Sequence, residues 1–228
     1  MSANLDHRSF SLPSSVSATG KELAIRIGII GAGNVGSTLG PAWRNRGHQV
    51  TFGVRRPDDP KYASLGAVET NESATATADV VVLCRPWEGT RAAVQGCGDL
   101  AGKVLIDCTN PLTPDFAALE VGLDTSGAEE IAKWARGARV CKAMNQIGAP
   151  MMDGPQVPGK PVMFVCGDDD AAKSVTAGLV SELGFETVDV GDLTAARLLE
   201  PYGLLWIHLA LRRGLGTNFA FGLLRGQS

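Results

Sequence analysis

Three glycines in the pattern Gly31-x-Gly33-x-x-Gly36 are the residues whose spacing most directly indicates chemistry. They follow an apolar, β-branched run from Ile25 to Ile30 and precede a helical pattern. In that setting the first glycine makes a tight turn, the second lets a pyrophosphate approach the backbone, and the third lets helix and strand pack closely. Free N–H groups and a partial positive charge at the helix N-terminus then face the phosphates. The pattern predicts a dinucleotide site.

Two arginines, Arg55 and Arg56, end the second expected strand, which runs from Gln49 to Gly53. An NAD-binding site usually has an acidic residue there, to hold the ribose hydroxyls. A guanidinium presents a planar fork of donors that suits a 2′-phosphate instead. The sequence therefore favours NADP(H) over NAD(H). The alternative is that both arginines are solvated, or paired with Asp58 or Asp59.

Three more segments follow expected strands, and ligands of open α/β sheets bind outside the carboxyl ends of strands. Arg85, Pro86 and Trp87 follow one strand, and Trp87 either flanks the cofactor or caps the core. Asn110 follows the next, where it either bonds the nicotinamide ribose or forms an Asn-Pro turn. The segment Ala143–Gly148, which contains Asn145 and Ile147, is interpreted as a wall near the position of hydride transfer.

No catalytic residue and no metal ligand is assigned from the sequence. The histidines His7, His48 and His208 lie far apart, and no serine nucleophile elbow is present. The acidic run Asp168–Asp170 is interpreted as a helix N-cap rather than a metal site. Hydride transfer between two ring systems requires no acid or base, only close rings and the exclusion of water.

Apolar strands alternate with helices along the chain, which predicts a sheet covered on both faces. The expected fold class is α/β: a Rossmann-type, doubly wound, mostly parallel sheet with a small C-terminal helical elaboration. Strands are predicted at 25–30, 49–53, 78–84, 104–107, 139–144, 162–166 and 186–190, and helices from Val35 to Gly47, with a kink at Pro41, and at 127–136, 171–183 and 194–213.

Length and composition fit one globular domain: 228 residues, 44% hydrophobic and 20% charged. The net charge of −3 excludes the basic surface that a nucleic-acid partner needs. No run reaches a membrane span, and five cysteines without a pairing motif suggest buried thiols in the cytoplasm. Residues 1–22 are expected to be a flexible arm, and residues 23–228 the NADP-binding domain, with its C-terminal elaboration from about 160.

The stretch from Leu198 to Leu211 is apolar on more than one side, so a helix there is expected to be buried. It packs either on its own sheet or on a partner. We predict a homodimer through this helix, which Trp206→Glu would convert to monomers.

Seven segments resemble the F420-dependent NADP oxidoreductases: GIIGAGNVGSTLG, GHQVTFGVRRP, ADVVVLCRPWE, VLIDCTNPL, VCKAMNQIGAP, FVCGDDDAAK and GDLTAARLLEP. The resemblance covers nearly everything from Ile25 to the C-terminus, and the GDDD and ARLLEP segments are its most specific parts. It implies a Rossmann domain with the 2′-phosphate near Arg55 and Arg56. It implies that NADP(H) binds at Gly31, Gly33, Asn34, Val35 and Gly36.

The resemblance also implies a small redox acceptor, the deazaflavin coenzyme F420, laid over the nicotinamide near Pro86, Trp87, Asn145 and Ile147. This chain departs from the family at two positions. Val54 stands where several members have Ser or Thr, which removes one hydrogen bond to the phosphate. Arg85 stands where an apolar residue is common, which changes the acceptors that fit.

Other functions remain open at this stage. The β-hydroxyacid dehydrogenases, pyrroline-carboxylate reductases and imine reductases share the Rossmann half, but need a large helical second domain that this chain lacks room for. An NADPH-dependent flavin or ferric reductase is the main enzymatic alternative. A non-catalytic NADP(H)-binding sensor is the alternative from another class, and NADPH oxidation with any acceptor would separate it from an enzyme.

Overall fold

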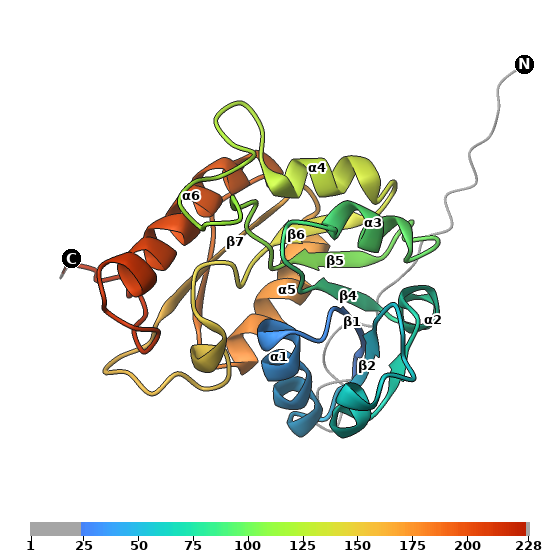
Figure 1. The fold of residues 1–228 in the computed structure, drawn as a ribbon. Coiled ribbons are helices and arrows are strands. Elements are labelled where there is room, and N and C mark those ends of the chain that lie inside the picture. The colour runs from blue at the N-terminus through green and yellow to red at the C-terminus, as the bar shows by residue number, and fades with distance from the viewer. Residues whose placement is uncertain (1–23, 227–228) are drawn as a thin grey trace, which may run out of the picture.

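An eight-stranded sheet forms the centre of the protein (Figure 1). The structure is a computed structural model that describes residues 24–226, so the predicted arm at 1–22 lies outside the described residues. The strand order is β3-β2-β1-β4-β5-β6-β7-β8. The strands are β1 (Arg26–Ile30), β2 (Gln49–Gly53), β3 (Val68–Glu69), β4 (Val80–Leu83), β5 (Val104–Asp107), β6 (Arg139–Lys142), β7 (Val162–Gly167) and β8 (Glu186–Asp189).

The sheet is mostly parallel, which confirms the predicted Rossmann-type fold class. All pairs from β3 to β6 are parallel, β7 runs antiparallel to β6, and β8 runs parallel to β7. Strands β4 and β5 are buried at every position, as is typical of parallel strands covered on both faces. The sequence did not predict the short edge strand β3, because two residues carry no periodic signal.

Helices cover both faces of the sheet (Figure 1). Helices α1 and α5 bury residues in one apolar cluster, and the indole N–H of Trp43 in α1 donates to the Leu179 carbonyl of α5 at 3.0 Å. Helices α3 and α4 bury residues in the cluster on the opposite face. The helices are α1 (Asn34–Asn45), α2 (Asn71–Ala76), α3 (Thr90–Gln95), α4 (Gly127–Trp134), α5 (Asp170–Glu182) and α6 (Ala196–Ile207), with 3₁₀ turns at Pro60–Leu65, Ala149–Met151 and Leu193–Ala195.

The acidic run before α5 acts as a helix cap, as predicted. The Asp169 carboxylate accepts from the Ala172 N–H at 2.7 Å, and Asp168 accepts from the Leu193 N–H at 2.8 Å. Asp168 thereby ties the end of β7 to the 3₁₀ turn that leads into α6.

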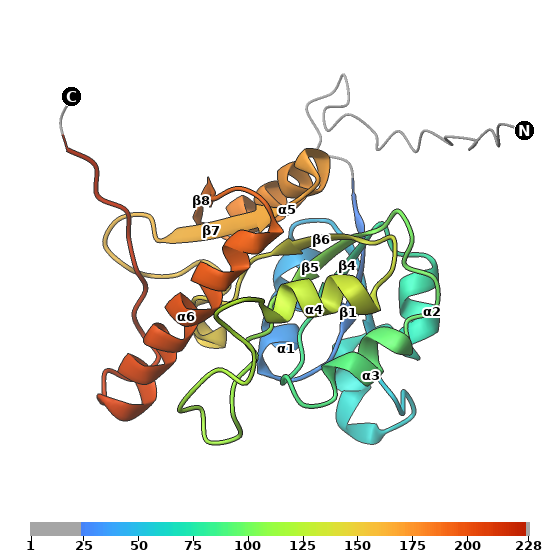
Figure 2. The ribbon, with the colours of Figure 1, turned by 90° about the horizontal axis from the view of Figure 1, so that it is seen from above.

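Helix α6 continues into a π-helical turn, His208–Arg212, and its burial differs from the prediction. One face, with Leu199, Gly203 and Trp206, is buried, whereas Leu198 and Leu205 on other faces are exposed. The Trp206 indole donates to the Phe219 carbonyl at 3.1 Å and stacks on its ring, because the last described residues run back beside α6 (Figure 2). Trp206→Glu would therefore disturb the chain's own packing, so a monomer in that variant does not by itself test the predicted dimer.

None of the helices within residues 24–226 combines the length and the apolarity that crossing a membrane would require.

Candidate cofactor site

The predicted site residues lie at one edge of the sheet, because each follows the carboxyl end of a parallel strand. Strand β1 lies between β2 and β4, so the chain order reverses there and the loops after β1 and β4 separate. A cavity of about 720 Å³ lies at this point. Its lining includes Gly31, Gly33, Ser37, Lys61, Tyr62, Arg85 and Pro86.

Each of the three motif positions requires glycine for a different structural reason. Gly31 has φ +111°, and a Cβ added there would lie 2.4 Å from the Cys84 carbonyl oxygen. A Cβ on Gly36 would lie 2.1 Å from the Gly31 oxygen, so helix and turn pack directly on it. A Cβ on Gly33 would meet nothing within 4 Å, so this glycine leaves open space above the backbone. An approaching pyrophosphate needs that open cradle, so the residues present fit a dinucleotide.

The N-terminus of α1 has the positive electrostatic potential that an anion site needs. Gly33 is its N-cap residue, no side chain caps the helix, and its first turn contains no acidic residue. The first N–H groups of a helix have no partner within the helix, and they carry a partial positive charge. A phosphate in the adjoining cavity would accept hydrogen bonds from these groups.

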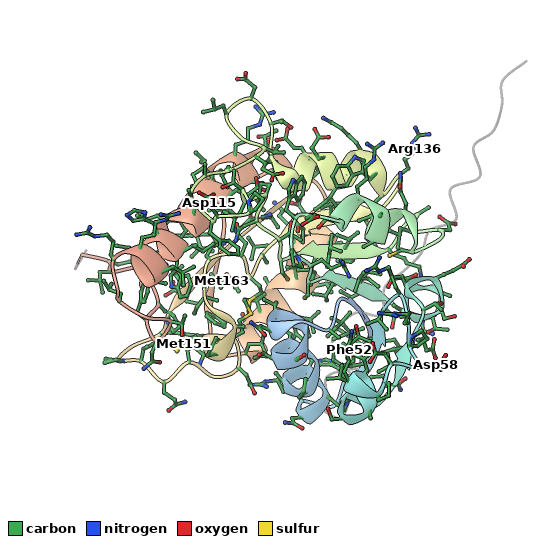
Figure 3. All side chains as sticks on the ribbon, viewed as in Figure 1. Phe52, Asp58, Asp115, Arg136, Met151 and Met163 are labelled. Atoms are coloured by element: carbon green, nitrogen blue, oxygen red, sulfur yellow. The ribbon has the colours of Figure 1, made fainter. Side chains whose placement is uncertain are left out.

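Arg55 and Arg56 follow β2 and are exposed. Asp59 forms an ion pair with Lys61 at 3.0 Å, and the Lys61 hydrogen bond holds the pKa of Asp59 below its ordinary value. Asp58 lies toward the outside of the molecule, beyond the buried Phe52 (Figure 3). Neither arginine forms an ion pair within residues 24–226, which leaves both guanidiniums available for a 2′-phosphate.

Lys61 and Tyr62 are cavity residues that the sequence analysis missed. They lie on the 3₁₀ turn Pro60–Leu65, and the Lys61 ammonium is 4.8 Å from the centroid of the Tyr62 ring. The signal was weak but present: Asp59 before a proline predicts a capped turn, and Asp59 does accept from the Lys61 N–H. The turn places a cation and an aromatic ring in the lining of the cavity.

Some of the residues after β4 line the cavity, and others pack against the core. Arg85 and Pro86 line the cavity. Trp87 packs on Trp134 of α4, with ring centroids 5.5 Å apart, and its edge lies against Gly127. Trp87 is half-buried and packs against the core on this face, and its contact with a cofactor stays a prediction.

Asn110 and Asn145 bond to each other across the ends of β5 and β6. The Asn110 amide donates to the Asn145 carbonyl at 2.8 Å, and the Asn145 amide donates to the Asn110 side-chain oxygen at 2.9 Å and to the Leu199 carbonyl at 2.9 Å. Gly203 allows α6 to come this close, since a Cβ there would lie 2.7 Å from the Asn145 carbonyl oxygen. Both asparagines thus join α6 to the sheet edge, and their contact with a cofactor stays a prediction.

Ile147 and the preceding Met144 are buried at the same edge. Met144 has φ +60°, a left-handed conformation that is uncommon for a side chain other than glycine. Such strain persists only where surrounding contacts hold it. The segment predicted as a wall is thus held at the edge of the sheet, where Met144 and Ile147 belong to the buried core cluster.

A buried cluster of charges supports this edge from beneath. Lys142, fully buried, donates to Asp107 at 2.8 Å, to Glu200 at 2.9 Å and to the Thr109 carbonyl at 2.6 Å. Glu200 also accepts from the N–H groups of Gly127 and Ala128 at the start of α4. Burial alone would lower the pKa of Lys142, but the two carboxylates together raise it above the ordinary 10.5.

This cluster joins β5, β6, α4 and α6, and the sequence analysis did not identify it. Asp107 and Lys142 are partners in the parallel register of β5 and β6. A charged residue at the end of each of two apolar strands was the available signal. It points to a pair only once the strands are known to be neighbours in register.

Comparison with known proteins agrees with this geometry. A sequence model of the family described as NADP oxidoreductase, coenzyme F420-dependent, matches residues 26–111, from β1 to just past β5. The crystal structure of a candidate F420-dependent NADP reductase from Arthrobacter sp. FB24 superposes with a TM-score of 0.82 at 31% identity, covering 89% of this chain and 100% of that one. The chain belongs to the F420-dependent NADP oxidoreductase family.

Two curated relatives widen the comparison. The F420-dependent NADP reductase of Methanocaldococcus jannaschii is 26% identical over 155 residues, which cover 65% of this chain and 70% of that protein. Metalloreductase STEAP3 of Rattus norvegicus is 28% identical over 183 residues, which cover 79% of this chain. The match spans only 37% of the metalloreductase, so this chain corresponds to one part of it.

Proposed function

We propose that this protein transfers a hydride between NADP(H) and a flat redox acceptor, in the first place the deazaflavin coenzyme F420. The observation that carries the proposal is the open cradle at Gly33, in a cavity at the switch point of the sheet, with two exposed arginines at the end of the next strand. Membership of the family supports F420 as the acceptor.

Different residues of the chain would bind different parts of the nucleotide. The N–H groups at the start of α1 would hold the pyrophosphate, and Arg55 and Arg56 would hold the 2′-phosphate through charge-assisted hydrogen bonds. The asparagine pair and the buried charge cluster hold the ends of β5 and β6 together at this edge of the sheet. Buried Met144 and Ile147 limit the access of water from the core side.

NADPH, when bound, supplies the hydride for this reaction. No side chain acid or base is required at the reacting carbons. The protein's contribution is to align two flat rings and to keep water from between them, which is an entropic and a desolvation effect. This assignment accounts for a site with glycines, arginines and apolar walls in which no catalytic residue has been identified.

The first experiment is a titration of the purified protein with NADPH and NADH, followed by coenzyme F420 under anaerobic conditions. We expect NADPH to bind more tightly than NADH and the deazaflavin absorbance to bleach. An Arg55→Ala, Arg56→Ala double variant should weaken NADPH by about 10- to 100-fold, the range for a charge-assisted hydrogen bond, and leave NADH nearly unchanged. Equal affinity of the wild type for both nucleotides would contradict the assignment to NADP(H).

Similarity to the metalloreductase supports a second acceptor class, ferric iron or a flavin. The same NADPH-loaded protein can be offered a ferric chelate and free flavin. NADPH oxidation by these without bleaching of F420 would favour this alternative. Tight NADPH binding without turnover of any acceptor would favour a sensor.

We also propose a homodimer formed through the outer face of α6. Leu198 is 71% exposed and Leu205 48%, and Leu211, at 60%, extends the apolar surface along the π-helical turn. Exposed leucines grouped on one element are typical of an interface. A cytoplasmic location and the lack of a nucleic-acid partner stay predictions from the sequence.

A further inference from the structure

Among the described residues, Arg85 is the one arginine that lines the cavity. Its Nε is buried and has no hydrogen-bond partner within residues 24–226. None of the ion pairs formed by the described residues includes Arg85. A buried donor without a partner is unfavourable, and in native proteins it often marks a place where a ligand completes the bonding.

The position of Arg85 is set by two glycines. Its Cγ lies 2.9 Å from the point where a Cβ on Gly31 would be, so the absence of a side chain at Gly31 makes room for the arginine stem. Its Nη2 lies 3.5 Å from the corresponding point at Gly89. The stem is therefore pressed against the turn of the glycine motif itself, on the β4 side of the cavity.

Arg85 follows β4 and Arg55 and Arg56 follow β2, so they lie on opposite sides of β1 in the strand order. Gly31, Gly33 and Ser37 line the cavity on the side of β1 and α1, and Arg85 lines it after β4, whereas Arg55 and Arg56 follow β2. A 2′-phosphate held at the end of β2 leaves the pyrophosphate between the start of α1 and Arg85. That anion has acceptor oxygens for a guanidinium fork and for the helix N–H groups at once.

We propose that Arg85 holds the pyrophosphate of the nucleotide from the β4 side, opposite the N-terminus of α1. This inference rests on the proposed function, because it requires the dinucleotide in the same cavity. It assigns two arginine sites to two phosphate groups. The pair at β2 discriminates NADP(H) from NAD(H), and Arg85 binds both nucleotides without discriminating between them.

The test uses ligands that carry one phosphate group or the other. ADP-ribose contains the pyrophosphate without a 2′-phosphate, and 2′,5′-ADP contains the 2′-phosphate without the pyrophosphate. Dissociation constants are measured by calorimetry at 0.15 M salt, where screening over about 8 Å suppresses the general effect of a lost charge. Arg85→Met should weaken NADPH, NADH and ADP-ribose alike, by about 10- to 100-fold, and 2′,5′-ADP by less than about 2-fold.

Two further variants keep the result interpretable. Arg91→Met removes an arginine that lies over Trp134 outside the cavity lining, and it should change none of the constants. Arg85→Lys keeps the charge without the planar fork, and should show the same ligand pattern with a smaller loss. If the Arg85→Met variant does not fold, the Arg85→Lys variant alone is sufficient for the test.

The outcomes separate the inference from the proposed function. Unchanged ADP-ribose affinity in the Arg85 variants would overturn the inference, as would an equal loss for 2′,5′-ADP. A variant that alters only the KM of the acceptor would assign Arg85 to an acidic group of the acceptor instead, and would overturn the inference as well. If the wild type binds neither NADPH nor ADP-ribose, it is the proposed function that fails.

Discussion

Replacing Lys142 by methionine tests whether the buried charge cluster holds the site edge together. The variant keeps an unbranched side chain of similar length but removes the only cation that the described structure places between Asp107 and Glu200. Both carboxylates then stay in the protein interior without it, at 0% and 1% exposure. Removing one partner of a buried ion pair typically costs about 3–5 kcal/mol.

That loss is a substantial fraction of the whole stability of a domain, which is about 5–15 kcal/mol. Urea unfolding followed by tryptophan fluorescence measures it directly. With a slope of about 3 kcal/mol per molar urea, the midpoint should fall by about 1–2 M. Lys133→Met is the matched control, because Lys133 forms an ion pair with Glu130 on the surface of α4 and its side chain is 62% exposed. Exposed pairs of this kind contribute about 0–1 kcal/mol.

The pH dependence gives a second readout with a definite sign. The pKa of Lys142 is raised in the folded protein, so its ionic contribution is complete below the unfolded value near 10.5 and is lost as the pH rises through the folded pKa. The stability difference between wild type and Lys142→Met should stay constant from pH 7 to 10 and shrink above that. A loss below about 1 kcal/mol at pH 7, or a difference that does not shrink in alkali, would refute the reasoning.

The remaining predictions concern the glycine motif, the cysteines and the dimer. Gly33→Ala should weaken nucleotide binding and leave the urea unfolding midpoint nearly unchanged, because its Cβ enters open space. Gly36→Ala should lower the midpoint, because its Cβ would meet a backbone oxygen at 2.1 Å. Calorimetry measures the binding and urea unfolding the midpoint, and equal behaviour of the two variants would contradict the assigned roles. All five cysteines are buried, and burial raises the pKa of Cys97 and Cys166 to about 12. A thiol reagent at pH 8 should therefore label no cysteine in the native protein and five cysteines after denaturation. Leu205→Glu should give a monomer mass in light scattering without loss of folding; a dimer mass would count against the α6 interface.

Local sequence patterns were enough to predict strand β1, the glycine turn, helix α1 and strand β2. The run Ile25–Ile30, the glycines after it and the arginines after β2 predicted a strand, a turn, a helix and a phosphate site, because each depends on neighbouring residues only. The structure bears out the turn and the open cradle at Gly31 and Gly33. Helices α2 and α3 have six residues each, too short for a periodic signal, and were not predicted.

Pairs of residues far apart in the chain were beyond these patterns. Helix α6 was expected to be buried because it is apolar on more than one side, yet Leu198 and Leu205 are exposed, and the chain end folds back onto Trp206 through its contact with Phe219. Asn110 was expected either to bond the nicotinamide ribose or to form an Asn-Pro turn, and Asn145 to lie in a wall beside the cofactor; no local pattern predicted that the two are hydrogen-bonded to each other. In both cases the partner lies at a sequence position that no local rule singles out.

The sequence by itself determined the cofactor class, because glycine spacing and the charge at a strand end are local properties of the backbone and of a side chain. Only the tertiary structure decided how the site edge is built. The ion pair of Lys142 with Asp107 depends on the register of β5 and β6, and that with Glu200 on the docking of α6. The lack of a hydrogen-bond partner for the Arg85 Nε among residues 24–226 likewise depends on what the whole fold places around it. Charge compensation and burial are sums over all spatial neighbours, so they become defined only when the chain has folded.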